Sequence, residues 1–304
     1  MTGTEIITVL SNNLSTVMSP INLVVGGLLT SIFLRHDTSV TEFEKIKSGQ
    51  FKEVTKLLLE SGKMTYVDYY QSNNFLEIAK KADKYYSEIH SDNSVDEITN
   101  YDFDWYVRFY QASGNVSDET MQDLWAKLLA GEVSKPSTYS FKTIDVLRNL
   151  SKKDAELFQR VCSYSFCNAN QIPILPRYDD YLEKYNIAYS DILKLSEQGL
   201  IFNDGTIVQS VNITEESKLL FWDTETVMTI KSSDGKDTKV YIHEYPFTQV
   251  GAEISTLVSV NVSDEKYIEF ATQISNENKN YLLGVYKVSE LNETSIRYNA
   301  NNLL

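Results

Sequence analysis

Apolar residues near the N-terminus recur at alternating spacings of three and four. Such spacings gather one side of a helix into an apolar seam suited to packing against another helix. The intervening side chains are small or polar, and no charge occurs between Glu5 and Arg35. Pro20 is expected to kink this helix. The seam and the apolar residues beside it are Ile7, Leu10, Leu14, Val17, Ile21, Val24, Val25, Leu28, Leu29, Ile32, Phe33 and Leu34.

This N-terminal segment allows two interpretations. Its most apolar part, residues 17–34, is at the short end of what crosses a hydrocarbon core of roughly 30 Å. It has no preceding basic region and no cleavage pattern after it, which disfavours a secretory signal. The alternative is a buried or oligomer-forming helix of a soluble protein. If the segment spans, Arg35 and the lysines after it place the bulk of the protein in the cytoplasm.

The middle of the chain, residues 41–171, is expected to be mainly helical. Apolar stripes predict helices over 41–62 and 66–89, and the polar residues 91–100 predict a linker between helical regions. Three further helices are predicted over 117–131, 141–150 and 151–161, with Ser117, Ser140 and Ser151 at their starts. Cys162 and Cys167 are placed in one helix.

The last third predicts a mixture of helices and strands. The proline-bounded segment 172–176 is expected to be a domain boundary. Helices over 178–185 and 190–198, followed by an N-D-G turn at 203–205 and a strand at 206–213, give the outline of a winged helix. Alternating residues over 226–231 and 238–245 predict a hairpin. Helices over 247–258 and 264–275 and a strand over 281–288 follow.

These elements predict an α+β protein. Its N-terminal two thirds are mainly helical, and a winged-helix-like domain with a small mixed sheet follows. The expected domains are 1–40 (apolar helix), 41–171 (helical domain) and 172–304 (α+β domain).

Charge is distributed unevenly along the chain. Its 28 basic and 42 acidic residues give a net charge of −14, which disfavours nucleic acid as a partner. The net charge is −1 over residues 1–90, −5 over 91–186 and −8 over 187–304. The N-terminal end is therefore the part suited to meet lipid or a second copy of the chain. Two cysteines provide no disulfide framework, and a reducing cytoplasm fits best.

Residues with catalytic chemistry are present but not gathered in a recognisable motif. No phosphate-binding or nucleophile motif occurs. Carboxylate pairs are common in so acidic a chain, so no catalytic residue, metal or cofactor is predicted, although a metal-dependent hydrolase using such pairs is a further alternative. The three histidines, which are too widely spaced for a zinc motif, are His36, His90 and His243. The carboxylate pairs are Asp179–Asp180 and Asp223–Glu225.

One block of the helical region carries a family resemblance. The pattern W-x-x-R-F at 105–109, followed by M-Q-x-L-W-A-K-L-L-A-G-E at 121–132, resembles an uncharacterised bacterial family of unknown function recorded mostly in prokaryotic and prophage genomes. The resemblance implies a bacterial or phage-related source and a helical core, and it brings no established activity. Arg108 is expected to stack on aromatic rings or to pair with an acid. The family-like core residues are Trp105, Arg108, Phe109, Leu124, Trp125 and Gly131.

The expected function is that of a non-enzymatic, oligomeric bacterial effector. It would act at the inner membrane through its N-terminal helix while its acidic cytoplasmic body senses an unidentified protein partner. The resemblance makes antiphage abortive infection, by a pore-forming or otherwise membrane-permeabilising action, the expected setting. The alternative is a soluble winged-helix adaptor or regulator that binds proteins and uses the N-terminal helix as a dimer contact.

Overall fold

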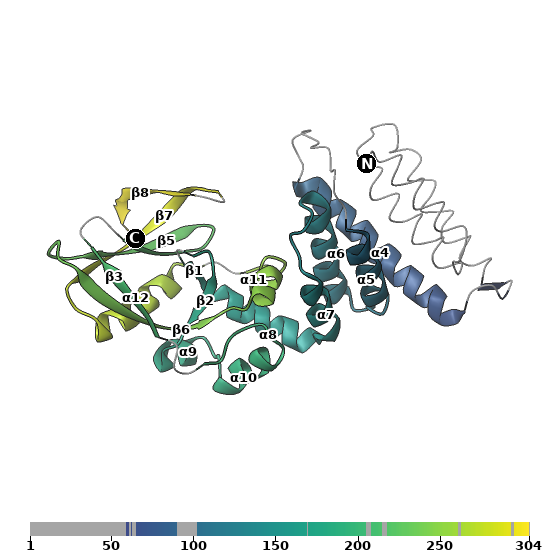
Figure 1. The fold of residues 1–304 in the computed structure, drawn as a ribbon, viewed down its shortest axis with the longest axis horizontal. Helices are drawn as coiled ribbons and strands as arrows, with labels where there is room; N and C mark the ends of the chain where they lie inside the picture. Colours follow the sequence, from purple (N-terminus) through teal and green to yellow (C-terminus); the bar gives the residue numbers. More distant parts are fainter. Residues whose placement is uncertain are drawn as a thin grey trace. The chain divides into compact units, whose positions relative to one another are not determined.

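The computed structural model describes residues 59–60, 62, 65–89, 102–168, 170–204, 208–214, 218–260, 263–292 and 295–303. Nine helices and eight strands lie within these ranges (Figure 1). The predicted helix at 6–34, most of the helix predicted over 41–62, the linker at 91–100, His36 and His90 lie outside them. Within the described ranges, no helix is long and apolar enough to cross a membrane. The chain divides into two compact units, Met1–Lys152 and Lys153–Leu304.

The described part of the first unit is helical. Helix α4 packs against α6, and α5 packs against α7. Aromatic rings fill the space between them: Phe109 stacks on Trp105 and meets Trp125 edge-on, with both pairs of ring centroids 5.3 Å apart. Such pairs bury large apolar areas in a fixed geometry. The helices are α4 (Tyr66–Ile89), α5 (Phe103–Ser113), α6 (Glu119–Ser134) and α7 (Phe141–Asn149).

Capping side chains explain where these helices begin. The hydroxyl of Ser140 accepts a hydrogen bond from the N–H of Thr143 at the start of α7, which confirms the predicted start. The cap of α6 is Asp118, whose carboxylate accepts from the N–H of Met121, and not the neighbouring Ser117. The predicted bounds of α4, residues 66 and 89, are confirmed.

The second unit is built on an eight-stranded sheet with the order β3-β6-β2-β1-β4-β5-β7-β8. All neighbouring strands are antiparallel, so the α+β class is confirmed, while the predicted small mixed sheet is wrong in both size and strand direction. The strands are β1 (Phe166–Asn168), β2 (Pro173–Pro176), β3 (Val208–Ile213), β4 (Leu219–Trp222), β5 (Thr226–Ser232), β6 (Thr238–Pro246), β7 (Tyr281–Leu291) and β8 (Ile296–Leu303).

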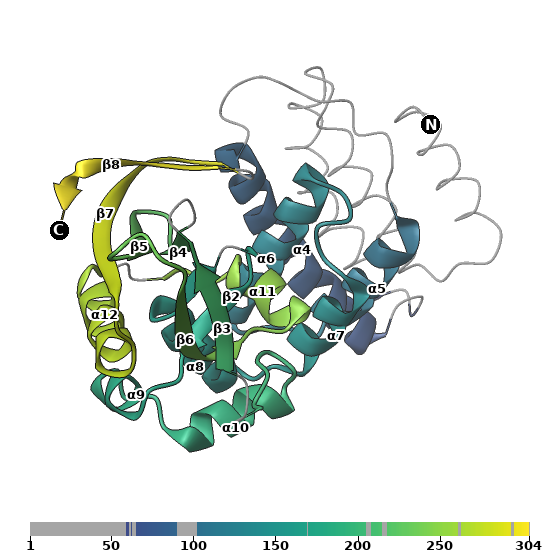
Figure 2. The same cartoon turned by 60° about the vertical axis from the view of Figure 1, so that its left-hand side comes forward.

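Five helices accompany this sheet. Helix α12 lies against it near β7 (Figure 2) and supplies Phe270, whose ring packs 4.9 Å from Phe166 and 5.2 Å from Phe221 between ring centroids. The core of this unit is therefore formed between α12 and the central strands. The helices are α8 (Lys152–Ser163), α9 (Asp179–Lys184), α10 (Tyr189–Glu197), α11 (Gln249–Ser255) and α12 (Glu265–Glu277).

The predicted hairpin of 226–231 with 238–245 is wrong in its pairing. Both strands form, but β5 pairs with β4 and β7, whereas β6 pairs with β2 and β3. The local turn residues determine that the chain reverses and do not determine which strands become neighbours. The hydroxyls of Ser232 and Thr238 nevertheless lie 3.4 Å apart, so the sheet curls to bring these ends together.

The segments expected to form the wing of a winged helix pair elsewhere. Ile201 forms an isolated bridge with Phe247, and all of β3 pairs with β6. Among the described residues, these two segments are not paired with each other. Strand β6 and the residue that follows it offer both segments a backbone edge, which the local N-D-G turn signal does not reveal.

Two other predictions differ from the structure. The units divide at Lys152/Lys153, whereas residues 172–176 contain a strand inside the sheet of the second unit. Proline favours extended backbone, which suits a strand as well as a linker. The predicted shared helix for the cysteines is wrong, because Cys162 lies in α8 and Cys167 in β1.

Candidate functional site

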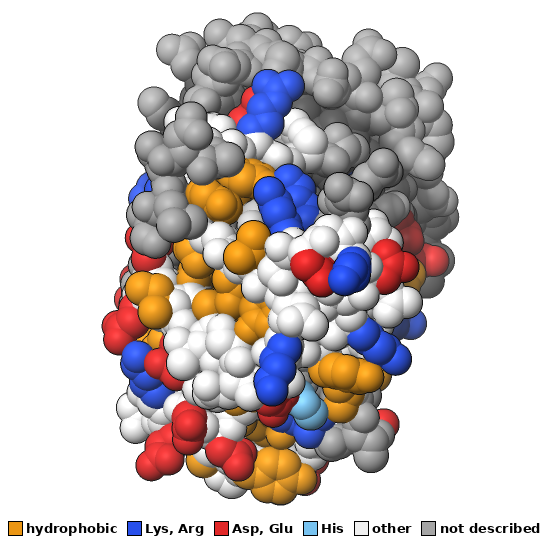
Figure 3. Space-filling model, turned by 90° about the vertical axis from the view of Figure 1, so that its left-hand side faces the viewer, with side chains coloured by type: hydrophobic (Ala, Val, Ile, Leu, Met, Phe, Trp, Pro, Cys, Tyr) orange, Lys and Arg blue, Asp and Glu red, His pale blue; other side chains and the backbone are white. Residues whose placement is uncertain are grey.

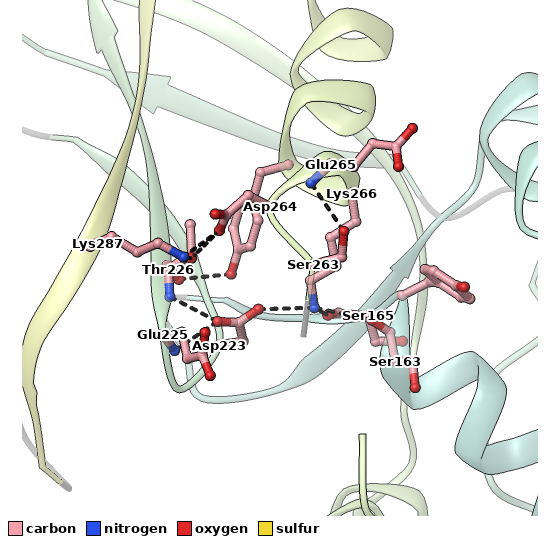
Figure 4. A network of polar contacts seen from close by, with 12 residues as sticks. Ser163, Ser165, Asp223, Glu225, Thr226, Ser263, Asp264, Glu265, Lys266 and Lys287 are labelled. Carbon is pink, nitrogen blue, oxygen red and sulfur yellow. Dashed lines mark hydrogen bonds and ion pairs between the residues drawn. The ribbon is translucent and has the colours of Figure 1, made fainter. Parts of the chain in front are cut away.

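A buried ion pair joins α12 to the turn between β4 and β5. The ammonium of Lys266, a residue that is only 2% exposed, lies 3.0 Å from Oδ2 of Asp223. It also donates hydrogen bonds to the carbonyl oxygens of Ser163 and Ser165, at 3.2 and 3.1 Å (Figure 4). Burial lowers the pKa of Lys266, and the charge of Asp223 opposes this change. Two carbonyl oxygens and one carboxylate oxygen thus surround the ammonium group.

The neighbouring sequence fixes both partners in place. Oδ1 of Asp223 accepts the backbone N–H groups of Glu225 and Thr226, which is an Asx turn that starts β5. The Lys266 ammonium also lies 5.0 Å from the ring centroid of Phe166 and 5.5 Å from that of Tyr267. Aromatic faces attract a desolvated cation, so the rings add to the stabilisation of the buried charge.

A second set of polar contacts extends this network to β7. Lys287 Nζ lies 2.7 Å from Oδ1 of Asp264, which also accepts the hydroxyl hydrogen of Thr226 at 2.7 Å. The hydroxyl of Tyr267 donates to the carbonyl oxygen of Thr226 at 2.7 Å. Figure 4 shows these side chains converging from β5, β7 and α12. These contacts therefore hold α12 against strands β5 and β7 of the sheet.

The carboxylate pairs suggested by the sequence are not brought together as catalytic pairs. Asp223 faces Lys266, whereas Glu225 is exposed. Asp179 and Asp180 are exposed in the first turn of α9, where acidic side chains stabilise a helix N-terminus. In the described part of the chain, no three His, Cys, Asp or Glu residues are placed to hold a metal ion.

A half-exposed cluster around His243 was not found from the sequence. Nε2 of His243 lies 3.0 Å from Oε2 of Glu277, and Nδ1 lies 3.4 Å from a guanidinium nitrogen of Arg177. A neutral imidazole with its proton on Nε2 satisfies both contacts. The backbone N–H of His243 donates to the hydroxyl of Tyr178 at 3.3 Å. This cluster joins residues far apart in the sequence, so no local spacing could reveal it.

Glu244, next to this cluster, is a buried acid. It is 5% exposed, and its Oε2 has no hydrogen-bond partner among the described residues. Burial raises its pKa to about 7. Its position in β6 gives a signal that sequence reasoning missed: Val240, Ile242 and Glu244 are alternate buried residues, so an acid occupies an inward position of the strand.

The family-like block of the first unit organises the connection from α6 to α7. The indole N–H of Trp105 donates to the carbonyl oxygen of Tyr139 at 2.8 Å. The carboxylate of Glu132 accepts the N–H groups of Ser137 and Tyr139, at 2.6 and 2.9 Å. A Cβ at Gly131 would lie 2.8 Å from the ring of Tyr139, so a side chain at this position would require the ring to shift. These motif residues support the fold of the connection.

The other residues of this block separate into core and surface. Phe109, Leu124 and Trp125 are buried. The side chain of Arg108 is 53% exposed, so it is not a core residue. Its guanidinium lies 4.8 Å from the ring centroid of Phe141 and 3.7 Å from Oδ2 of Asp145, in agreement with the expected stacking and pairing.

Exposed apolar side chains gather at α10 and in the segment after it. Tyr189 and Leu193 are four residues apart on the helix, with exposed fractions of 61% and 40%. Phe202 is 52% exposed, and the amide of the next residue, Asn203, reaches the hydroxyl of Tyr189 at 3.5 Å. We call Tyr189, Leu193 and Phe202 the α10 patch. Figure 3 shows, for one face of the molecule, hydrophobic side chains gathered between separated basic and acidic ones.

Comparisons with known proteins identify the family of the chain. The chain matches none of the curated proteins and none of the solved structures with which it was compared. The family match spans both units and includes the α6–α7 connection and the Lys266–Asp223 pair. Residues 63–272 match the family described as "Protein of unknown function (DUF2806)", and the chain therefore belongs to this family.

Proposed function

We propose that this protein is a non-enzymatic bacterial effector that oligomerises and acts at the inner membrane through residues 6–34. The observation that carries the proposal is the absence of charge over 29 consecutive residues in a chain of net charge −14. An uncharged helix with an apolar seam is compatible with lipid or with a second copy of itself, whereas the acidic remainder favours water. The protein is thus polarised between an associating end and a solvated body.

In this proposal the body detects a protein partner. The α10 patch supports this role, because exposed aromatic and aliphatic side chains provide contact area that is desolvated on binding. Partner binding would then permit oligomers of the N-terminal segments to permeabilise the membrane. Abortive infection, in which an infected cell loses its membrane potential, is the setting that we propose for this action.

Fractionation of the full-length chain tests the membrane step. The wild type is expected in the membrane fraction, and a chain that lacks residues 1–34 is expected in the soluble fraction. Two lysine substitutions distinguish a spanning helix from a dimer helix. Val24→Lys changes a residue of the predicted seam, and Asn22→Lys changes one on the predicted polar side of the same segment. Both weaken insertion of a single span, whereas only Val24→Lys weakens a soluble dimer. A soluble, monomeric wild type would contradict the proposal.

The α10 patch also favours a second candidate, a soluble winged-helix-like adaptor that binds proteins. In the order of elements along the sequence, α10 would correspond to the recognition helix of such a domain. It exposes Tyr189 and Leu193 and has a single basic residue, Lys194. Apolar exposure with so little positive charge suits a protein partner better than DNA. Native mass spectrometry separates the candidates: the adaptor is a detergent-free dimer, and the effector requires detergent or lipid.

A further inference from the structure

One part of the α10 patch is held in place by the sheet beside it. The backbone N–H of Phe202 donates to the carbonyl oxygen of Pro246, at the end of β6, at 2.9 Å. The preceding residue, Ile201, forms a bridge with Phe247. The side chain of Phe202 is nevertheless half exposed. The sheet thus fixes the backbone of this segment while the aromatic ring remains in contact with water.

Helix α10 presents the rest of the patch from an equally fixed position. Its residues Ile192 and Leu195 are completely buried and hold the helix on the second unit. The carboxylate of Asp191 accepts the backbone N–H of Ala188 at 3.1 Å and lies 3.5 Å from a guanidinium nitrogen of Arg160 in α8. Apolar side chains on a fixed backbone lose less conformational entropy on binding than those of a mobile loop. The patch is therefore preorganised for docking.

Acidic side chains outnumber basic ones around the patch. Residues 178–204, which contain α9, α10 and the segment after α10, carry six acidic and two basic side chains. One of the two bases, Lys184, is already paired with Glu265 and Glu269, at 3.0 and 2.9 Å. The other base is Lys194. This part of the chain therefore has an excess of negative charge that its own bases do not neutralise.

One of these acids does not stabilise the helix that carries it. Asp179, Asp180 and Asp191 lie in the first turns of α9 and α10, where the helix dipole favours negative charge. Glu197 is the last residue of α10, where the dipole disfavours negative charge. It is exposed and lies one helical turn after Leu193 on the same side of the helix. Its carboxylate is thus placed beside the apolar patch, where it can meet a cation of a bound partner.

Two kinds of partner fit this combination poorly. A second copy of the same surface would bring its acidic side chains against those of the first, and an anionic lipid headgroup would meet the same repulsion. An apolar patch with acidic neighbours instead complements a helix that has apolar residues on one side and Lys or Arg beside them. Tyr189 and Leu193, four residues apart, form a row of side chains against which such a helix can pack.

We infer that the α10 patch binds a basic amphipathic helix of a partner protein. Apolar residues one turn apart on the partner cover Tyr189, Leu193 and Phe202, and a Lys or Arg of the partner pairs with Glu197. This inference rests on the proposed role of the body in detecting a protein, and it specifies the chemistry of that protein. It applies to the effector and to the adaptor alike, because both use the same surface.

Photo-cross-linking to the full-length chain tests the site. The probe is a synthetic peptide of leucine and lysine in which the leucines form one face of a helix and benzoylphenylalanine replaces one leucine. The protein is irradiated with the probe in phosphatidylcholine nanodiscs, and peptide mass spectrometry locates the attachment. We expect the attachment within residues 189–204. Absence of attachment there, or attachment spread over other acidic surfaces, would overturn the inference.

Matched variants test the apolar contacts. Leu193→Ser is expected to lower cross-linking by the probe at least about tenfold, which is typical of losing a central side chain of an interface. Leu282→Ser, on β7, removes an apolar side chain that is 59% exposed and should leave cross-linking unchanged. Both positions are exposed, so both variants should fold, and circular dichroism verifies this. Equal cross-linking of Leu193→Ser and the wild type would contradict the inference.

Charge is tested separately. A probe with glutamate in place of every lysine should cross-link at least about tenfold less than the lysine probe. Glu197→Gln should lower cross-linking of the lysine probe about two- to fivefold, the range for an exposed ion pair, whereas Asp237→Asn in the exposed β5–β6 connection should not. Equal cross-linking of the two probes would refute a basic partner.

The same measurements separate this inference from the membrane step of the proposed function. A chain that is soluble on fractionation but is cross-linked at α10 refutes the membrane step alone. A membrane-bound chain in which Leu193→Ser has no effect on cross-linking refutes the basic amphipathic partner alone.

Discussion

The ammonium of Lys266 lies 3.0 Å from the carboxylate of Asp223, and both groups are largely removed from water. Asp223→Ala leaves a buried cation with two carbonyl partners and no counter-charge. We expect it to lower the free energy of unfolding by about 3 kcal/mol, measured by urea denaturation. Lys266→Met should cost less, because Asp223 keeps its backbone hydrogen bonds to Glu225 and Thr226. Asp180→Ala, on the exposed surface of α9, is the control and should be nearly neutral. Equal effects of Asp223→Ala and Asp180→Ala would show that the ion pair does not stabilise the fold.

Because of Glu244, we expect the stability of the folded protein to fall as the pH rises. Its folded-state pKa of about 7 is above the ordinary value of 4.5, so the folded protein binds the proton more tightly than the unfolded chain does. The free energy of unfolding should therefore decrease between pH 4.5 and 7, by up to about 3 kcal/mol. The charged group of Glu244 interacts electrostatically with Tyr178, whereas Arg177 and Glu277 contact the neighbouring His243.

The substitution Glu244→Gln isolates this effect. Glutamine retains the size of the side chain and cannot titrate, so urea denaturation at pH 5 and pH 8 should give more similar stabilities for the variant than for the wild type. Glu277→Gln, on the exposed side of the His243 cluster, controls for the surrounding charges. If wild type and Glu244→Gln have the same pH dependence, Glu244 is not the group responsible.

Glu132 should contribute to the stability of the first unit through the α6–α7 connection. Its carboxylate accepts two backbone N–H groups while the residue is 2% exposed. Glu132→Ala leaves these donors without their acceptor, which should cost about 2 kcal/mol, measured by chemical denaturation. Asp145→Ala removes only the exposed contact with Arg108 and should change the stability by less than about 0.5 kcal/mol. A neutral Glu132→Ala would show that the connection folds without this acid.

Gly251 is predicted to be intolerant of any side chain. A Cβ at this position of α11 would overlap the carbonyl oxygen of Leu200, which is backbone and cannot rotate away. Gly251→Ala should therefore destabilise the second unit by about 2 kcal/mol in denaturation experiments, although alanine is the better helix former. Ala252→Gly in the same helix is a control for helix propensity alone. A stabilised Gly251→Ala variant would mean that α11 can move away from Leu200.

The sequence was most informative where local interactions decide the structure. The apolar stripe of α4 and the cap at Ser140 depend on residues within one or two turns, and both predictions are confirmed. Arg108 stacks on Phe141 at the protein surface, as is expected of an arginine that has aromatic residues nearby in the same helical region. Fold class followed from the same periodicities.

Strand neighbours and the polar sites depended on contacts between distant segments. The turn at 233–237 predicts a reversal, but β4 and β7 compete for the edges of β5 and exclude β6. The partner of Lys266 is Asp223, whose local sequence signals only a turn. Likewise, β2 resembles a linker because its two prolines favour extended backbone in either structure.

The separation of β5 from β6 in the sheet also affects how the second unit folds. A short connection joins them, yet neither can complete its pairing by closing a local hairpin. Strand β6 needs β2, which is more than 60 residues earlier in the chain, and β5 needs β7, about 50 residues later. Folding rates fall as the mean sequence separation of contacts increases. During synthesis, β5 must therefore wait with one edge unpaired until β7 has emerged from the ribosome, and the second unit should fold more slowly than the helical first unit.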